Sequence, residues 1–178
     1  MAARLDQIDL GRFWKQGYRG ILLDIDNTLS PWLARNPDPA AVKWVRQAQA
    51  SGFRVCLVSN ARWRRIRHYA QVLGVEMVHA GRKPGKRPFL AAAERLGLPV
   101  HQLIVVGDQL LTDVWGAKRV GMAAVLVDPI SPGEFVGTRF ARLAERFILW
   151  QLARRGRISR SELNRRLQAL RRRSLRPV

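Results

Sequence analysis

Short apolar runs alternate with longer amphipathic segments along most of this chain. Five runs rich in Val, Ile and Leu are predicted to be strands: Gly20–Asp24, Arg54–Val58, Glu76–His79, Leu103–Val106 and Ala123–Val127. The segments between them have helical spacing and repeatedly end in glycine, as helix C-termini favour. Strands that are apolar on both faces and alternate with helices indicate a parallel sheet covered on both sides. The pattern predicts a Rossmann-like three-layer α/β sandwich with a central parallel sheet of about five strands.

Two further helices are predicted near the C-terminus. Thr138–Arg155 repeats apolar side chains at helical spacing, and Ser159 with Glu162 forms a capping box that opens a second helix with a narrow leucine stripe. Proline and glycine residues precede this region, and the density of positive charge along the chain increases where it begins. We therefore predict a core over residues 1–138 and a helical tail over residues 139–178.

Positive charge sets this tail apart. The 178 residues contain 32 Lys+Arg and 13 Asp+Glu, a formal net charge of +19. Residues 139–178 hold 13 arginines and two glutamates, a net charge of +11. Such an excess disfavours cationic substrates and favours anionic partners: phosphates, nucleic acid or an acidic membrane surface.

Composition also excludes several kinds of site. A single cysteine, Cys56, rules out a disulfide framework and a Cys-rich zinc site, and the three histidines are scattered. No apolar run reaches the roughly 18–20 residues of a membrane span, and Met1–Leu10 lacks a signal-peptide core. We expect a cytoplasmic protein, or one bound to a membrane face from outside.

Large apolar side chains within the helical and strand segments are expected to fill the core. Trp14, Trp44 and Trp115 are predicted to anchor it, because tryptophan buries a large apolar area. Cys56 lies inside an apolar strand and is expected to pack there as a small hydrophobe.

Polar groups gather where the predicted strands end. Asp24 and Asp26 follow the first strand, Ser59 follows the second, and Asp108 and Asp113 follow the fourth. Two carboxylates at the end of an apolar strand are costly unless they are paired, hydrogen-bonded or bound to a metal. The carboxyl ends of parallel strands meet at one edge of the sheet, where ligands bind.

A lysine follows the third predicted strand at the same edge. Lys83 is the leading candidate and Lys86 is the alternative. Carboxylate oxygens suit a hard Mg²⁺ ion, while a lysine and a hydroxyl stabilise charge on phosphoryl oxygens. These groups together predict phosphoryl transfer.

These motifs resemble, in order and spacing, those of the haloacid dehalogenase phosphatase superfamily. They read Asp24-x-Asp26-x-Thr28, Ser59, Lys83 and Gly107-Asp108-x-x-x-x-Asp113. More narrowly, Asp26-Asn27-Thr28-Leu29, Ser59-Asn60, Lys83-Pro84 and Gly107-Asp108-Gln109-Leu110-Leu111-Thr112-Asp113 are similar to the capless bacterial relatives of mitochondrial and plastid phosphatidylglycerophosphate phosphatases. The resemblance covers roughly Phe13–Pro129, and the Arg-rich stretch Ala61–Arg67 departs from the pattern.

The resemblance implies a role for each matching residue. Asp24 would be the nucleophile that forms an aspartyl-phosphate, and Asp26 would protonate the leaving alcohol and then activate water. The carboxylates of Asp24 and Asp108 and the backbone carbonyl of Asp26 would bind Mg²⁺.

The remaining motif residues would support this chemistry. Thr28 and Ser59 would position the loop and the phosphoryl group. Lys83 would offset charge between phosphate and nucleophile and would be held by Asp113, with Asn60 as a supporting residue.

The gaps between motifs predict that no cap domain is present. Asp26 to Ser59 has room for one loop and one helix, and Ser59 to Lys83 for one helix and one strand. Relatives that act on small metabolites usually insert a cap there. An uncovered site favours a large or surface-presented phosphomonoester, such as a lipid head group, a protein or a nucleic-acid end.

The basic tail bears on the choice among these substrates. Basic amphipathic helices with Phe, Trp and Leu suggest a membrane interface, and each arginine near anionic lipid contributes about 1 kcal/mol. With the resemblance, this makes phosphatidylglycerophosphate the leading substrate, at the inner membrane face. Association with RNA or the ribosome is an equally good explanation of the tail, and a tail that only faces solvent is another. A phosphatase for nucleotide or protein phosphomonoesters is a further alternative.

Overall fold

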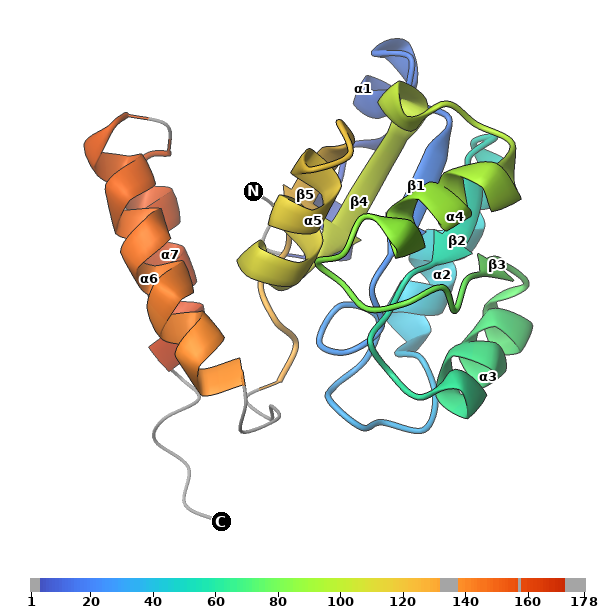
Figure 1. Ribbon diagram of the computed structural model, residues 1–178, viewed down its shortest axis with the longest axis horizontal. Coiled ribbons are helices and arrows are strands. Elements are labelled where there is room, and N and C mark those ends of the chain that lie inside the picture. The colour runs from blue at the N-terminus through green and yellow to red at the C-terminus, as the bar shows by residue number, and fades with distance from the viewer. Residues whose placement is uncertain (1–3, 132–137, 157, 172–178) are drawn as a thin grey trace.

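The computed structural model describes residues 4–131, 138–156 and 158–171, with 138–144 and 171 described as backbone only. A five-stranded sheet runs in the order β3-β2-β1-β4-β5 with every neighbouring pair parallel (Figure 1). The strands are β1 (Gly20–Leu23), β2 (Arg54–Leu57), β3 (Glu76–Met77), β4 (Leu103–Gly107) and β5 (Ala123–Leu126). The predicted parallel α/β fold is confirmed, with strand ends shifted by a residue or two.

Helices cover both faces of the sheet. They are α1 (Leu10–Lys15), α2 (Pro39–Ala50), α3 (Trp63–Leu73), α4 (Arg87–Leu96) and α5 (Trp115–Lys118), with short 3-10 turns η1 (Leu5–Gln7) and η2 (Val100–Gln102) and a π-helical turn η3 (Leu110–Val114). Side chains alternate along a strand, so β1 sends Ile21 and Leu23 into the cluster with α2 and α3, and Leu22 into the cluster with α4 and α5. The core therefore has two layers, one on each side of the sheet.

Local sequence signals set the helix ends. The Asp38 side chain accepts a hydrogen bond from the Ala40 amide at 2.8 Å, so it caps α2, and α3 ends at Gly74 with φ of 62°. In the tail, the amide of Glu162 donates to Ser159 Oγ at 3.1 Å and the amide of Ser159 donates to Glu162 Oε2 at 3.0 Å. The predicted capping box is confirmed.

Trp115 corrects one expectation about the core. Trp44 is buried as predicted, but Trp115 is 52% exposed, with the Arg119 guanidinium 5.0 Å from the centre of its ring. The small residue Gly116 packs against the Phe89 ring instead, with no room for a β-carbon. Because α5 approaches the core through its small residues, Trp115 points outward.

The tail forms two helices beside the β5 side of the sheet (Figure 1). They are α6 (Thr138–Arg154) and α7 (Arg160–Arg171), and their buried side chains include Glu145, Leu149 and Arg166. Within residues 4–131, 138–156 and 158–171, no helix is long and apolar enough to cross a membrane.

Gly107 ends β4 where the carboxylate of Asp113 lies directly over it. A β-carbon at this position would overlap the Asp113 side chain, whereas one on Gly11 would meet its nearest atom, Asp9 Oδ1, at 3.5 Å. We expect Gly107→Ala to lower the free energy of unfolding by about 1–3 kcal/mol, the usual cost of overpacking. Urea denaturation measures this. Gly11→Ala is the control and should not destabilise, so equal stability of the two variants would contradict the close packing.

Candidate active site

Three buried carboxylates meet at the carboxyl edge of the sheet. Asp24 follows β1 and Asp108 follows β4, and these strands are neighbours, so the two side chains emerge together. Asp113 reaches the same place from η3. One carboxylate oxygen from each of the three residues lies within 4.8 Å of the other two. The ends of β1 and β4 and the turn η3 thus bring together three of the acidic groups selected from the sequence.

Lys83 lies between two of these carboxylates. Its Nζ is 2.6 Å from Asp24 Oδ1 and 2.5 Å from Asp113 Oδ1. Burial alone lowers the pKa of the Lys83 ammonium, but the charges of Asp113 and Asp24 outweigh that effect and raise it above its ordinary value. Lys86 is exposed at the start of α4. The structure therefore places Lys83, rather than Lys86, among the carboxylates.

The Asn60 side chain fixes the backbone that carries this lysine. Asn60 Oδ1 accepts a hydrogen bond from the Lys83 amide at 2.9 Å, and Asn60 Nδ2 donates to the Lys83 carbonyl at 3.1 Å. Ser59, the preceding residue, is buried, and its Oγ accepts a hydrogen bond from the Ala61 amide at 3.3 Å. The segment after β2 thereby holds the lysine loop against the sheet edge.

The charge balance of this cluster favours a bound cation. Burial raises the pKa of Asp113 to about 6, against the opposing charge of Lys83, and Asp24 adds to the rise. Three carboxylates face one ammonium, and their oxygens are the hard ligands that Mg²⁺ prefers. The donor set therefore fits a divalent metal ion, whose charge would relieve the repulsion.

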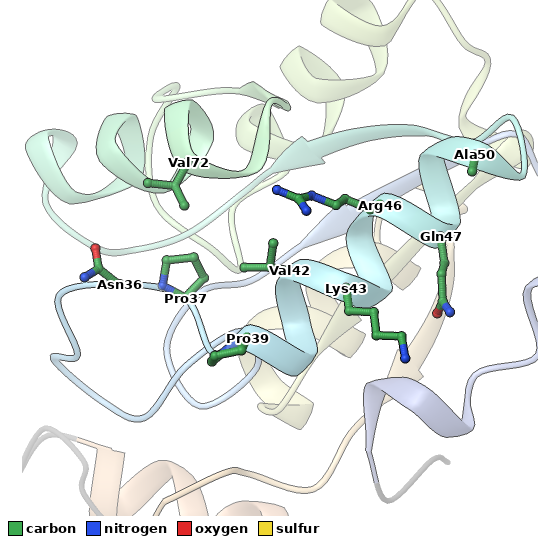
Figure 2. Close-up of a pocket in the computed structure, with 9 residues that line it drawn as sticks. All are labelled: Asn36, Pro37, Pro39, Val42, Lys43, Arg46, Gln47, Ala50 and Val72. Carbon is green, nitrogen blue, oxygen red and sulfur yellow. The ribbon is translucent and has the colours of Figure 1, made fainter.

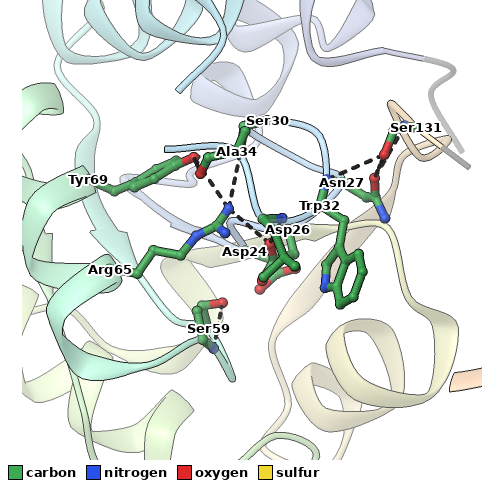
Figure 3. Close-up of polar contacts among 12 residues, drawn as sticks. Asp24, Asp26, Asn27, Ser30, Trp32, Ala34, Ser59, Arg65, Tyr69 and Ser131 are labelled. Carbon is green, nitrogen blue, oxygen red and sulfur yellow. Dashed lines mark hydrogen bonds and ion pairs between the residues drawn. The ribbon is translucent and has the colours of Figure 1, made fainter. Parts of the chain in front are cut away.

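Asp26 forms an ion pair with an arginine on α3. Arg65 NH2 lies 2.9 Å from Asp26 Oδ1, and the Leu33 amide donates to the same oxygen at 3.4 Å (Figure 3). Burial raises the pKa of the Asp26 carboxyl above its ordinary value, and Arg65 partly offsets the rise. This carboxyl therefore keeps its proton to higher pH than an exposed aspartate does, although Arg65 limits the effect.

Arg65 was not among the residues selected from the sequence. Its NH2 also donates to Ser30 Oγ at 3.4 Å and to the hydroxyl of Tyr69 at 3.3 Å (Figure 3). Tyr69 lies four residues further along α3, on the same helix face, and its ring is fully buried. The i, i+4 spacing of Arg65 and Tyr69 was the available signal, but Arg65 lies in the stretch Ala61–Arg67 that departs from the family pattern.

The loop after Asp26 is fixed by the segment that follows β5. Asn27 has a left-handed backbone with φ of 60°, and its Oδ1 accepts hydrogen bonds from Ser131 Oγ at 2.8 Å and the Ser131 amide at 3.2 Å (Figure 3). Next to it, Thr28 Oγ1 is buried and has no hydrogen-bond partner among the described residues. A buried hydroxyl without a partner is costly, so this atom is suited to receive one from a ligand.

A surface hollow of about 650 Å³ lies between α2 and α3 (Figure 2). Val42, Lys43 and Val72 are among the residues that line it. Its lining, all within the described part of the chain, contains no carboxylate and none of the site residues named above. This hollow therefore shares no residue with the acidic cluster at the sheet edge.

Comparison with known proteins identifies the family. The model of the haloacid dehalogenase-like hydrolase family matches residues 30–121, about half of the chain. The chain is also 36% identical over 148 residues to the probable phosphatase YqeG of Bacillus subtilis, covering 83% of this chain and 86% of that protein. The chain therefore belongs to the haloacid dehalogenase-like hydrolase family, and it is a phosphatase.

Two further similarities concern one sequence and one solved structure. Chloroplastic phosphatidylglycerophosphate phosphatase 1 of Chlamydomonas reinhardtii is 34% identical over 142 residues, which is 74% of this chain and 52% of that protein. The D,D-heptose 1,7-bisphosphate phosphatase of B. bronchiseptica, crystallised with magnesium and phosphate, has a TM-score of 0.51 at 18% identity over 62% of this chain and 81% of that one. The second likeness concerns the fold alone.

Arg65→Gln tests whether Arg65 lowers the pKa of the Asp26 carboxyl. Loss of the positive charge should raise the pKa of Asp26 further, because Arg65 lowers it. If protonated Asp26 is the acid, the alkaline limb of the kcat/KM profile should move to higher pH by about one unit. The measurement is the pH profile with p-nitrophenyl phosphate. Arg64→Gln, an exposed neighbour on α3, is the control, and an unchanged or lower limb in Arg65→Gln would contradict the assignment.

Proposed function

We propose that this phosphatase uses Mg²⁺ and an aspartyl-phosphate on Asp24 to hydrolyse phosphatidylglycerophosphate at a membrane surface. The observation that carries the proposal is the buried cluster of Asp24, Asp108 and Asp113, two of which, Asp24 and Asp113, contact Lys83. A nucleophile, a cation site and an ammonium at one point are what phosphoryl transfer requires.

The reaction would proceed in two displacements. A carboxylate oxygen of Asp24 attacks phosphorus, the ester P–O bond breaks, and its electron pair goes to the leaving alcohol oxygen, which takes the proton of Asp26. Asp26 then removes a proton from water as the water oxygen attacks phosphorus. The bond between phosphorus and Asp24 breaks, which restores the carboxylate and releases inorganic phosphate. The raised pKa of Asp26 supports its role as the first proton donor.

The other groups would position and neutralise the phosphoryl group. Lys83, already on Asp24 Oδ1, offsets charge as the phosphate approaches. The unpartnered Thr28 hydroxyl can donate to a phosphoryl oxygen. Asp24, Asp108 and the Asp26 carbonyl would hold Mg²⁺, which, when bound, stabilises negative charge on the phosphoryl oxygens.

The absence of a cap supports a large substrate. In the described part of the chain, α2 and β2 fill the sequence between Asp26 and Ser59, and α3 and β3 fill that between Ser59 and Lys83. All four elements belong to the core, so neither gap contains a cap domain. The phosphatidylglycerophosphate phosphatase named among the relatives supports a lipid head group as the substrate.

The outward face of α6 supports docking on an anionic membrane. Phe147 is 61% exposed and Trp150 is 45% exposed, with ring centroids 6.2 Å apart, and the Arg154 guanidinium lies 4.7 Å from the centre of the Trp150 ring. Leu149, on the opposite face, is buried. Exposed aromatics flanked by arginines are typical of helices that lie in the membrane interface. These contacts support the proposal that the protein binds the cytoplasmic face of the membrane as a peripheral protein.

Asp24→Asn tests the nucleophile. The amide cannot form the aspartyl-phosphate, so Mg²⁺-dependent phosphate release from p-nitrophenyl phosphate should fall by about 10³-fold or more. Asp6→Asn, an exposed aspartate outside the site, is the matched control and should keep wild-type turnover. A variant lacking the Asp24 carboxylate that still turned over would contradict the mechanism.

A Phe147→Ser/Trp150→Ser double variant tests the docking face and the substrate. Binding to phosphatidylglycerol vesicles should weaken roughly tenfold or more, as should turnover of phosphatidylglycerophosphate in those vesicles, because two interfacial aromatics are lost. Turnover of p-nitrophenyl phosphate should not change. Sedimentation with vesicles and phosphate release measure these effects.

Val72→Ser/Leu90→Ser is the matched control, since it removes two comparably exposed apolar side chains from the core helices. Its vesicle binding should equal that of the wild type. Wild-type protein that bound RNA but not vesicles, or that turned over only soluble phosphomonoesters, would overturn the lipid proposal.

A further inference from the structure

One tail arginine is buried at the edge of the catalytic sheet. Arg166, on α7, is 0% exposed. Its NH1 donates to the Val127 carbonyl at 2.6 Å and its NH2 donates to the Asp108 carbonyl. NH2 also donates to Glu145 Oε1 at 2.7 Å, and NH1 lies 3.3 Å from Asp128 Oδ1. The guanidinium is thus held by main-chain and carboxylate oxygens.

The two main-chain partners follow neighbouring strands. Asp108 comes directly after β4 and Val127 directly after β5, and the two strands pair in parallel. A guanidinium presents its donors in a rigid planar fork, so one side chain can bind both carbonyls at once. An ammonium is a point donor and cannot reproduce this span. Arg166 therefore connects the tail to the backbone on which Asp108 is mounted.

Glu145 supplies the charge that makes this burial tolerable. A buried arginine is costly unless it is paired and its donors are satisfied, and Glu145 is itself 2% exposed. It comes from α6, while Arg166 comes from α7, so both tail helices contribute to the contact. Arg166 is thus distinct from the solvated or lipid-facing arginines of the tail.

We propose that Arg166 is a positioning residue of the active site. By binding the carbonyl of Asp108 it fixes the peptide that directs this carboxylate into the acidic cluster, so the tail is part of the metal-binding apparatus. The inference rests on the proposed function in one respect, namely that Asp108 holds Mg²⁺. Residues that orient a metal ligand in this way typically alter metal affinity by about 10–100-fold when replaced.

The decisive variant replaces both members of the buried ion pair. Arg166→Met with Glu145→Leu removes both charges of the pair, and Asp128 keeps Arg165 at 3.3 Å as a partner. Such apolar replacements of a buried ion pair are often neutral for stability. We expect a folded protein whose Mg²⁺ dissociation constant, measured by calorimetric titration of the full chain with Mg²⁺ alone, rises about tenfold or more. Amide hydrogen exchange over residues 107–113 should also become faster.

Two single variants complete the test. Arg166→Lys keeps the charge but loses the fork, so it should weaken Mg²⁺ binding in the same direction. Arg165→Met is the matched control: this neighbouring arginine is 40% exposed in its side chain and lies 3.3 Å from Asp128 Oδ2. It removes the same charge from α7, and its Mg²⁺ affinity should stay within about twofold of wild type, because it does not contact Asp108.

The outcomes separate this inference from the proposed function. Wild-type Mg²⁺ affinity in the double variant, or in Arg166→Lys if the double variant does not fold, would overturn the positioning role. An equal loss in Arg165→Met would overturn it as well, since charge alone would then explain the effect. A wild-type protein that bound Mg²⁺ but released no phosphate would defeat the proposed function while leaving the test of Arg166 intact. No Mg²⁺ binding by wild type would defeat both.

Discussion

The contact between the Lys83 ammonium and the carboxylates of Asp24 and Asp113 is the interaction on which the site depends. Three buried carboxylates repel one another, and a buried charge without a partner is costly. Lys83 offsets part of that charge, and the negative charge that remains favours a divalent cation. Two neighbouring residues keep these charged groups in place. Asn60 holds the backbone of Lys83, and Gly107 leaves the space that the Asp113 carboxylate occupies.

The order of strands explains why these groups converge. β1 and β4 are neighbours in the middle of the sheet, so Asp24 and Asp108 emerge side by side although more than eighty residues separate them. Asp26 follows the same strand as Asp24 but pairs with Arg65 of α3. Two carboxyl groups from one short segment thus have different electrostatic environments. Such a division suits a nucleophile that must stay charged and an acid that must hold a proton.

The parts of the structure that depend on local pattern could be predicted from the sequence. The five strands and the Ser159–Glu162 capping box follow from apolar spacing and short-range hydrogen bonds. The convergence of the carboxylates followed from parallel topology. Arg166 could not be found this way, because nothing local distinguishes it among 32 basic residues, and Arg65 was marked only by its i, i+4 spacing to Tyr69. The positions of both arginines are decided by contacts between distant segments, and Trp115 was misplaced for the same reason.

The burial of Arg166 also limits how this protein can be divided or recombined. The chain changes in composition near residue 138. Arg166, which follows this point in the sequence, nevertheless binds the carbonyl of Asp108, which precedes it. Substitution of α7 by another basic helix would preserve the overall charge and still remove that bond. A replacement of α7 that is to keep this contact therefore has to retain Arg166 opposite Glu145 of α6 and the Asp108 carbonyl after β4. In this molecule, a region recognisable by its composition is not an interchangeable module.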